Sequence, residues 1–437
     1  MHPTPRSIIA SALLLLATGC GTSASNGTTP RADAAVDAVE AAVEDTGSEA
    51  PADVGVDSGP AAPFPAFTPV NPVVNDFGGP TLIAPRIVPV FMSGGDAGTY
   101  PFEAQLRTFL GAYLASPEWL TQVGEYGVHA GTVAPSLHST GAGLGTSAID
   151  SAQIHAWAQA QLRAGAFGTT SAGDLVVLFL DGSRQGAVGP TQTLCHTIGG
   201  YHESITDATG RGVALAVIPD CYDNLEIITN ALSHEMVEAV TDAFPNRFPA
   251  FYQPGTMDAP DGAWAMAYDG GEVADLCEQR SDASYLVTSL GHTIQRTWSN
   301  MAAAANTDPC VPVPPGSVYF NSAPVLPEIV QLTGPDGVHT VGARGITIAN
   351  GASAMVPVQL FSTGPTSGPW QVTAREVPRA GTATALRFTW NHTTGRNGDT
   401  LQLSIAVRAR IPEGRVFIVR STLGGQSTTW VGAVVSP

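Results

Sequence analysis

Lysine is absent from this chain of 437 residues, and all 19 basic residues are arginine. Acidic residues number 37, which gives a formal net charge of −18. Proteins that bind nucleic acid gather basic side chains against the phosphates, and the arginines of this chain are not clustered. The charge therefore argues against a nucleic-acid partner. We interpret the missing lysine as genomic composition.

Long apolar runs are also scarce. Arg6 precedes an apolar run over residues 8–17, which is too short to span a bilayer and leads to Cys20. This pattern resembles a bacterial lipoprotein signal peptide, whose cleavage leaves the cysteine as a lipidated N-terminus. We therefore expect residues 1–19 to be removed and Cys20 to anchor the exported protein to the cell envelope, most simply the outer membrane. Secretion without the lipid is the alternative.

Large apolar side chains are missing from residues 20–63. This stretch is mostly Ala, Asp, Glu, Val, Ser, Thr, Gly and Pro, and between Gly21 and Pro63 eight acidic residues accompany only Arg31. Such a composition cannot bury a core and repels itself. It predicts a disordered acidic tether between the anchor and the folded part.

Cysteine is limited to five residues, and no C-x-x-C spacing occurs, which disfavours a cysteine-rich zinc site. Apart from Cys20, four cysteines remain in an exported chain, and an even number indicates disulfides. Three connectivities exist. We favour the connectivity in which both disulfides close local loops, Cys195 with Cys221 and Cys277 with Cys310.

The composition of the remainder, 43% apolar residues overall, allows sizeable cores. Residues 64–312 alternate strand and helix patterns, which predicts an α/β domain with a mixed sheet. The expected strands are 82–92, 174–180 and 212–218, and the expected helices are 101–115, one that begins at Pro117 after Ser116, and one capped by Asp150 or Ser151. A proline-rich hinge, Pro312 to Pro315, follows.

Beyond Gly316 the pattern changes to eight short apolar runs separated by turn residues. Residues 316–437 therefore predict an all-β, immunoglobulin-like sandwich of antiparallel strands. Its three tryptophans, Trp370, Trp390 and Trp430, could form a face that stacks on a glycan. Burial in the sandwich core is the interpretation we prefer, because tryptophan is highly buried on average.

The segment from Asn230 to Phe244 predicts a helix that carries metal-binding side chains on one face. His234 and Glu238 stand one turn apart on the same face, with Glu235 beside them. A histidine and a carboxylate at this spacing can both bind one Zn²⁺, and Glu235 can act as general base, as in the related H-E-x-x-H helix of zinc peptidases. A solvated helix edge is the alternative. The apolar residues around the motif and the lack of Lys and Arg argue against it.

A zinc ion needs a third protein ligand. Glu272 and Asp275 are the main candidates, and the carboxylate that does not bind zinc would orient His234. Further candidates are Asp242, His196 and His202. Tyr201 and His202, which follow two glycines, are also suited to polarise a substrate carbonyl and stabilise an oxyanion.

The segment from about Gly79 to Cys310 resembles the exordium-like, phosphate-induced protein family and its bacterial relatives. The resemblance rests on four motifs: Gly200-Tyr201-His202 after a cysteine, Ser233-His234-Glu235-x-x-Glu238-Ala239-x-Thr241-Asp242, Glu272-x-x-Asp275-x-Cys277, and Trp298-Ser299 before the last cysteine. It implies an extracellular protein with a zincin-like helix. It does not imply a reaction, because the plant members are associated with cell-wall growth and signalling without an agreed chemistry.

Two functions follow as hypotheses. The first is a lipid-tethered zinc hydrolase, most simply a peptidase, in which His234, Glu238 and either Glu272 or Asp275 bind the metal and Glu235 is the general base. The second is a non-catalytic surface protein whose sandwich binds a partner or a glycan.

Overall fold

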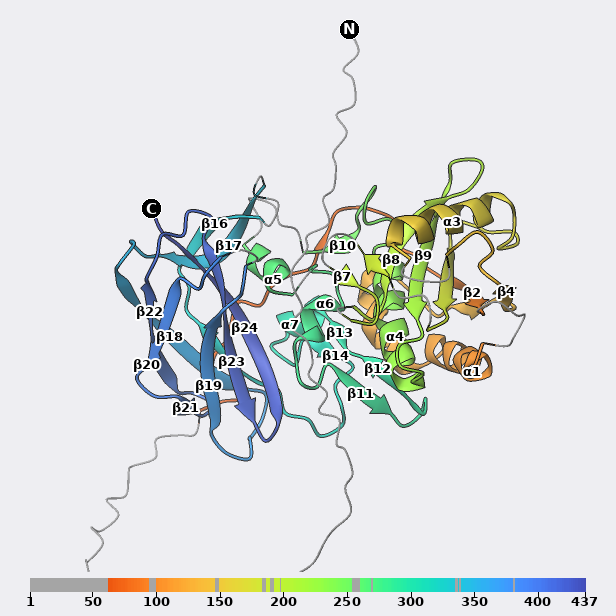
Figure 1. The fold of residues 1–437 in the computed structure, drawn as a ribbon. Coiled ribbons are helices and arrows are strands. Elements are labelled where there is room, and N and C mark those ends of the chain that lie inside the picture. Colours follow the sequence, from red (N-terminus) through yellow and green to blue (C-terminus); the bar gives the residue numbers. More distant parts are fainter. Residues whose placement is uncertain are drawn as a thin grey trace, which may run out of the picture.

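The computed structural model describes residues 62–93, 100–145, 149–182, 186–188, 192–196, 198–253, 260–268, 270–334, 337, 339–379 and 382–437. The predicted signal peptide, Cys20 and nearly all of the predicted tether lie outside these residues. An α/β domain lies beside an all-β sandwich (Figure 1). Within the described ranges, no helix has both the length and the apolar character that a membrane span requires.

The α/β domain is built on a mixed sheet with the strand order β3-β2-β5-β9-β8, and β4 also pairs with β2. Only β8 is antiparallel to its neighbour. The strands β5 and β9 are almost entirely apolar and buried, as expected where a parallel sheet is covered on both faces. The strand bounds are β2 (Arg86–Met92), β3 (Thr132–Val133), β4 (Leu137–Ser139), β5 (Asp174–Leu180), β8 (Tyr201–Thr206) and β9 (Gly212–Pro219).

Helices cover both faces of this sheet. Successive residues of its central strands belong alternately to two separate apolar clusters, one on each face. One cluster includes residues of α1 (Glu103–Leu114), α2 (Pro117–Val123) and α4 (Leu225–Thr241), and the other includes residues of α3 (Ser151–Arg163). The predicted caps are confirmed. Ser116 accepts a hydrogen bond from the backbone of Trp119, and Asp150 forms a capping box with Gln153. A short 3-10 helix, η1 (Gly124–Tyr126), follows α2.

The bounds predicted for the central helix were wrong at both ends. The helix α4 begins at Leu225, five residues earlier than predicted, because the side chain of Asn224 accepts hydrogen bonds from the first backbone amides. It ends at Thr241 because Asp242 leaves the helical conformation and its carboxylate accepts a hydrogen bond from the backbone of Ala250.

The other elements before the sandwich are short. They are β1 (Asn75–Asp76), β6 (Ala187–Val188), β7 (Gln192–Thr193), β10 (Phe251–Tyr252), α5 (Gly262–Ala267), α6 (Asp275–Glu278), β11 (Ser284–Val287), β12 (His292–Gln295), β13 (Thr297–Trp298), α7 (Asn300–Ala304) and β14 (Cys310–Val311). Both predicted disulfides, Cys195–Cys221 and Cys277–Cys310, are present. They indicate an exported protein, since disulfides persist in oxidising compartments.

The predicted sandwich is confirmed, with one exception to its antiparallel pattern. One sheet has the order β15-β18-β22-β20, and the other β16-β17-β24-β23-β19-β21. Residues 345–347 of β17 pair with β24 in parallel, so the prediction of purely antiparallel strands was wrong there. The bounds are β15 (Phe320–Pro324), β16 (Glu328–Thr333), β17 (Thr340–Thr347), β18 (Ser353–Ser362), β19 (Trp370–Glu376), β20 (Leu386–Trp390), β21 (Thr394–Gly395), β22 (Thr400–Val407), β23 (Arg415–Leu423) and β24 (Gln426–Val435).

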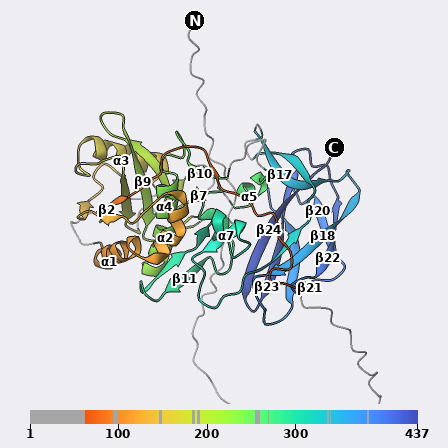
Figure 2. The same ribbon diagram turned by 180° about the vertical axis from the view of Figure 1, so that it is seen from behind.

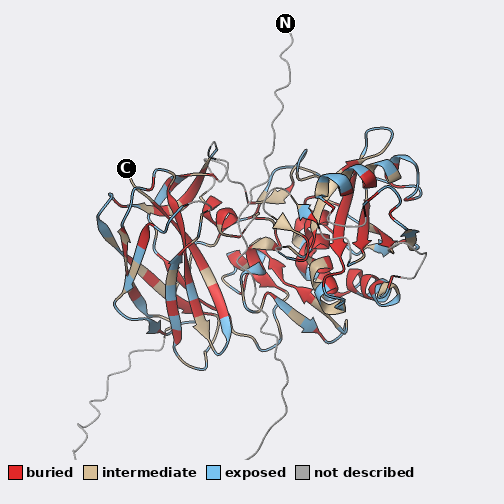
Figure 3. Ribbon diagram, viewed as in Figure 1, coloured by how far each residue is buried: buried red, intermediate tan, exposed pale blue. Residues whose placement is uncertain are grey.

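The two domains share a buried interface, and buried residues run through both (Figure 3). Trp264 of α5 packs edge-on against Trp430 of β24, with ring centroids 5.5 Å apart. Trp370 and Trp430 are buried and Trp390 is half-buried, so the first two belong to the core. The view from behind shows the segment that precedes β2 running across both domains (Figure 2). Its start is held by the side chain of Asn397.

Candidate metal centre

The H-E-x-x-E motif lies on α4 and faces the segment that leads into α6. The Nε2 atom of His234 lies 3.2 Å from Oε2 of Glu238 and 3.6 Å from Oδ1 of Asp275. One ligand atom from each of these three residues lies within 4.8 Å of the other two. His234, Glu238 and Asp275 therefore form a group that can hold a metal ion.

A second group shares Glu238 and adds His202 and Glu272. The Nδ1 atom of His202 lies 3.6 Å from Oε2 of Glu238, and its Nε2 atom lies 3.3 Å from Oε1 of Glu272. The sequence left open which carboxylate accompanies His234. In the structure Asp275 groups with His234, whereas Glu272 groups with His202.

The strand β8 separates two residues that the sequence treated together. Successive strand residues face opposite sides of a sheet. His202 pairs in register with Ala216, which packs in the same cluster as α4, whereas Tyr201 pairs with Val217, which packs with α3. His202 therefore joins the cluster of acidic residues, and Tyr201 does not. Within the described part of the chain, the Tyr201 hydroxyl has no hydrogen-bond partner.

Glu235 lies beside both groups without belonging to either. Its Oε2 atom is 3.5 Å from Nδ1 of His202, and its side chain is almost fully buried. Gly200, just before β8, makes this position available. A Cβ atom at Gly200 would lie 2.9 Å from Cγ of Glu235 and 3.0 Å from the carbonyl oxygen of Val217. The glycine is therefore required for the close approach of α4 to β8.

Backbone amides orient the carboxylates. Oε1 of Glu238 accepts hydrogen bonds from the amides of Ala274 and Asp275, each at 3.2 Å. Oδ2 of Asp275 accepts hydrogen bonds from Gly271 and Glu272 at 2.9 and 3.0 Å. In both side chains, the other oxygen points to His234. Each carboxylate is thus fixed through one oxygen while the second remains available to a cation.

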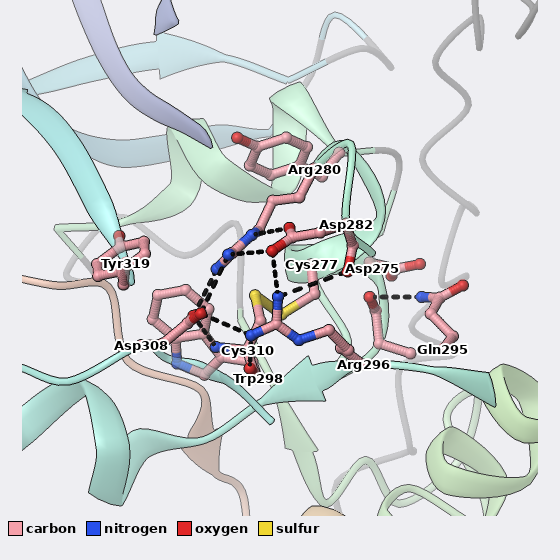
Figure 4. Close-up of a disulfide and its surroundings, with 12 residues drawn as sticks. Asp275, Cys277, Arg280, Asp282, Gln295, Arg296, Trp298, Asp308, Cys310 and Tyr319 are labelled. Atoms are coloured by element: carbon pink, nitrogen blue, oxygen red, sulfur yellow. Dashed lines mark hydrogen bonds and ion pairs between the residues drawn. A yellow bond between two sulfur atoms is a disulfide. The ribbon is translucent and has the colours of Figure 1, made fainter. Parts of the chain in front are cut away.

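The segment that carries Glu272 and Asp275 is anchored at two points. Gln295 of β12 donates from its side chain to the carbonyl of Ala274, and its backbone amide donates to Ser233 of α4. The Cys277–Cys310 disulfide holds α6 from the other side (Figure 4). Gln295 was not identified from the sequence, because a lone glutamine in a short strand carries no pattern that marks such a role.

Burial and charge oppose each other at the two histidines. Burial lowers the pKa of both histidines. The charge of Glu238 outweighs burial at His234, and that of Glu272 does so at His202, so that both pKa values are raised well above the ordinary histidine value. The carboxyls shift in the same direction. Burial raises the pKa of Glu238, and burial together with the charge of Glu238 raises that of Asp275. All four shifts favour the protonated form, as expected where buried carboxylates lie close together.

These donors fit a divalent metal such as zinc, which takes histidine nitrogen and carboxylate oxygen. Bonds of about 2.0–2.2 Å in a tetrahedron separate neighbouring ligand atoms by about 3.3–3.6 Å. The separations of 3.2 and 3.6 Å around His234 are close to this range. In addition, His202 Nε2 and Glu272 Oε1 are buried and make no hydrogen bond to any described residue.

Two further candidates lie outside both groups. His196 is exposed in the turn after Cys195. Asp242 is the C-terminal cap of α4, and burial followed by the charge of Glu272 raises its pKa to about 7. Neither residue is placed to complete the ligand set of His234.

Comparisons with known proteins identify no relative. No family model matches the chain, and no curated protein matches it. Solved structures that resemble part of it include the titin M3 domain (14% identity, 21% of this chain and 88% of that chain, TM-score 0.15) and a chimeric titin Z1Z2 (8%, 28% and 97%, 0.17). The twitchin kinase region from C. elegans is another (14%, 24% and 20%, 0.16). Scores this low support no conclusion about fold or function.

Proposed function

We propose that the protein is an exported, zinc-dependent hydrolase that cleaves peptides. The observation that carries this proposal is the convergence of His234, Glu238 and Asp275 beside the nearly buried Glu235. A zincin-like role for α4 agrees with the resemblance to the exordium-like family. Attachment to the envelope through lipid on Cys20 is part of the same proposal and rests on the sequence alone.

A bound zinc ion would supply Lewis acidity, which lowers the pKa of water and polarises a carbonyl group. Glu235 takes a proton from the attacking water and then gives it to the leaving amine. The restricted surroundings of Glu235, between α4 and Gly200, keep its carboxylate in one position. His234, Glu238 and Asp275 would hold the metal.

The position of β8 favours a peptide over other hydrolase substrates. It is the last strand in the order of the main sheet, and it carries His202 into the cluster. An extended peptide can add to such an edge strand by backbone hydrogen bonds. The scissile bond of a peptide bound there would lie next to Glu235.

Removal of the metal tests this function directly. The purified mature protein is expected to contain zinc and to cleave casein or a mixed peptide library. Dialysis against a chelator should abolish cleavage, and added zinc should restore it. A protein that contains no zinc and cleaves nothing would favour the alternative, a non-catalytic surface protein, and deletion of residues 316–437 would then test whether the sandwich binds a partner or a glycan.

Substitution of Gly200 by alanine is expected to reduce cleavage by about 10- to 100-fold with a smaller loss of zinc, because the atoms nearest to the added Cβ belong to Glu235 and to the carbonyl of Val217 and not to a candidate metal ligand. The measurements are peptide turnover and zinc content. Gly111→Ala is the matched control, since nothing lies within 4 Å of a Cβ atom at that position in α1. Unchanged turnover in Gly200→Ala would show that the position of Glu235 is not important for catalysis.

A further inference from the structure

The group of His202, Glu238 and Glu272 is not used by a single zinc ion on His234. Its residues come from three different parts of the fold: β8, α4 and the segment before α6. Glu238 belongs to both groups, and its Oε2 atom is 3.2 Å from Nε2 of His234 and 3.6 Å from Nδ1 of His202. One carboxylate oxygen thus faces both histidines.

The state of His202 indicates that this second group is built for a ligand. Only 4% of its side chain is exposed, and its Nε2 atom has no hydrogen-bond partner among the described residues. That atom lies 3.3 Å from Oε1 of Glu272, within ion-pair distance, but the two atoms do not form a hydrogen bond, and Oε1 is likewise buried without one. One ligand atom from each of His202, Glu238 and Glu272 lies within 4.8 Å of the other two, and 3.3 Å is the separation of neighbouring ligands of a tetrahedral metal, about 3.3–3.6 Å. Buried polar atoms otherwise find partners.

Charge gives an independent reason for a second cation. Four carboxylates, those of Glu235, Glu238, Glu272 and Asp275, meet in this cluster. In the described structure none of them forms an ion pair or a hydrogen bond with an arginine. With both imidazoles neutral as ligands, two divalent ions balance all four carboxylates. With one ion, the negative charge that remains has only the imidazole of His202 to balance it. Uncompensated buried charge is strongly unfavourable.

From this geometry we infer a two-metal centre in which Glu238 is shared, one ion being held by His234 and Asp275 and the second by His202 and Glu272. The ligand of the second site is a divalent cation of the zinc class. The inference deepens the proposed function, which supplies the first ion, and gives the hydrolase a pair of neighbouring ions. Ions about 3.5–4 Å apart in such centres can stabilise both the attacking and the leaving group.

Metal stoichiometry of the purified mature protein tests the inference. The protein is stripped with a chelator, reloaded with excess zinc, separated from free metal and analysed for zinc per chain. We expect two zinc ions in the wild type, one in His202→Ala and in Glu272→Gln, and fewer than one in Glu238→Gln. Glu103→Gln is the matched control and should keep two, because Glu103 pairs with the exposed His138 away from the cluster.

Manganese provides a second readout. Two Mn²⁺ ions that share Glu238 should give an exchange-coupled electron paramagnetic resonance spectrum, which Glu272→Gln should convert to that of isolated ions. Circular dichroism checks that each variant is folded, and the partly exposed Glu272 gives the test if His202→Ala unfolds.

One zinc ion per wild-type chain, or two in both His202→Ala and Glu272→Gln, would overturn the two-metal centre. One zinc ion with peptide cleavage removes the second site and leaves the proposed function intact. Two zinc ions without cleavage support the two-metal centre and remove the peptidase function.

Discussion

Substitution of Glu235 by glutamine is expected to leave the zinc content unchanged and to reduce peptide cleavage by about 10²–10⁴-fold. The reason is that glutamine keeps the size of the side chain but cannot accept the proton of the attacking water. Glu235 belongs to neither group of metal ligands, so its loss does not remove a donor. The measurements are turnover of a peptide substrate and zinc per chain on the same preparation.

Two controls separate this result from general damage. Glu238→Gln should lose both zinc and activity, because Glu238 belongs to the ligand set. Glu203→Gln should keep both, since Glu203 is the neighbour of His202 on β8 but pairs with His155 of α3 on the opposite face. Cleavage by Glu235→Gln at the wild-type rate would eliminate Glu235 as the general base.

The residues of α4 that form the cluster could be chosen from the sequence, because helical spacing alone brings His234 and Glu238 to one face. The role of β8 could not be predicted from the sequence. Its residues, Tyr201–Thr206, are mostly polar, so that no apolar alternation marked them as a strand. Once the strand is known, its period of two separates Tyr201 from His202, which the sequence had treated as a pair.

The grouping of Asp275 with His234 depends on tertiary contacts between residues far apart in the sequence. Glu272 and Asp275 are three residues apart in one short segment, and local spacing does not decide which of them faces His234. The choice follows from Gln295, the Cys277–Cys310 disulfide and the amides that bind Glu238. The disulfides themselves were predictable, because pairing neighbouring cysteines closes short loops.

The apolar patterns were sufficient for the strands of the sandwich but not for the segment that precedes it. Arg296 is fully buried, although arginine in a sequence is normally taken for a surface residue. It donates hydrogen bonds to Asp282 and Asp308 and to the carbonyls of Cys310 and Pro312 (Figure 4). Such a network depends on residues between 280 and 312 that come together only in the folded chain.

Substitution of Asp308 by asparagine is expected to destabilise the fold by about 3–5 kcal/mol, the usual effect of removing one partner of a buried ion pair. Asp308 receives hydrogen bonds from both Arg280 and Arg296, at 3.1 and 2.6 Å for their Oδ2 contacts, and all three side chains are buried. Without the carboxylate, two guanidinium groups share only Asp282. Denaturant unfolding of the metal-loaded protein, followed by tryptophan fluorescence, measures the change in free energy of unfolding.

The effect of Asp308→Asn should also depend on pH with a definite sign. Burial raises the pKa of Asp308, but the positive charges of Arg280 and Arg296 lower it by more than burial raises it. The pKa in the folded protein therefore lies below the ordinary value of 3.8. The carboxylate therefore stabilises the fold fully above that value, and the contribution is lost as the pH falls through the folded pKa. The difference between wild type and variant should be constant at neutral pH and shrink in acid.

Glu413→Gln is the control. Glu413 is partly exposed, and its partner Arg415 retains an ion pair with Glu376 after the substitution, so that the free energy of unfolding should change by less than about 0.5 kcal/mol. An Asp308→Asn variant as stable as this control would show that the buried arginines do not need Asp308.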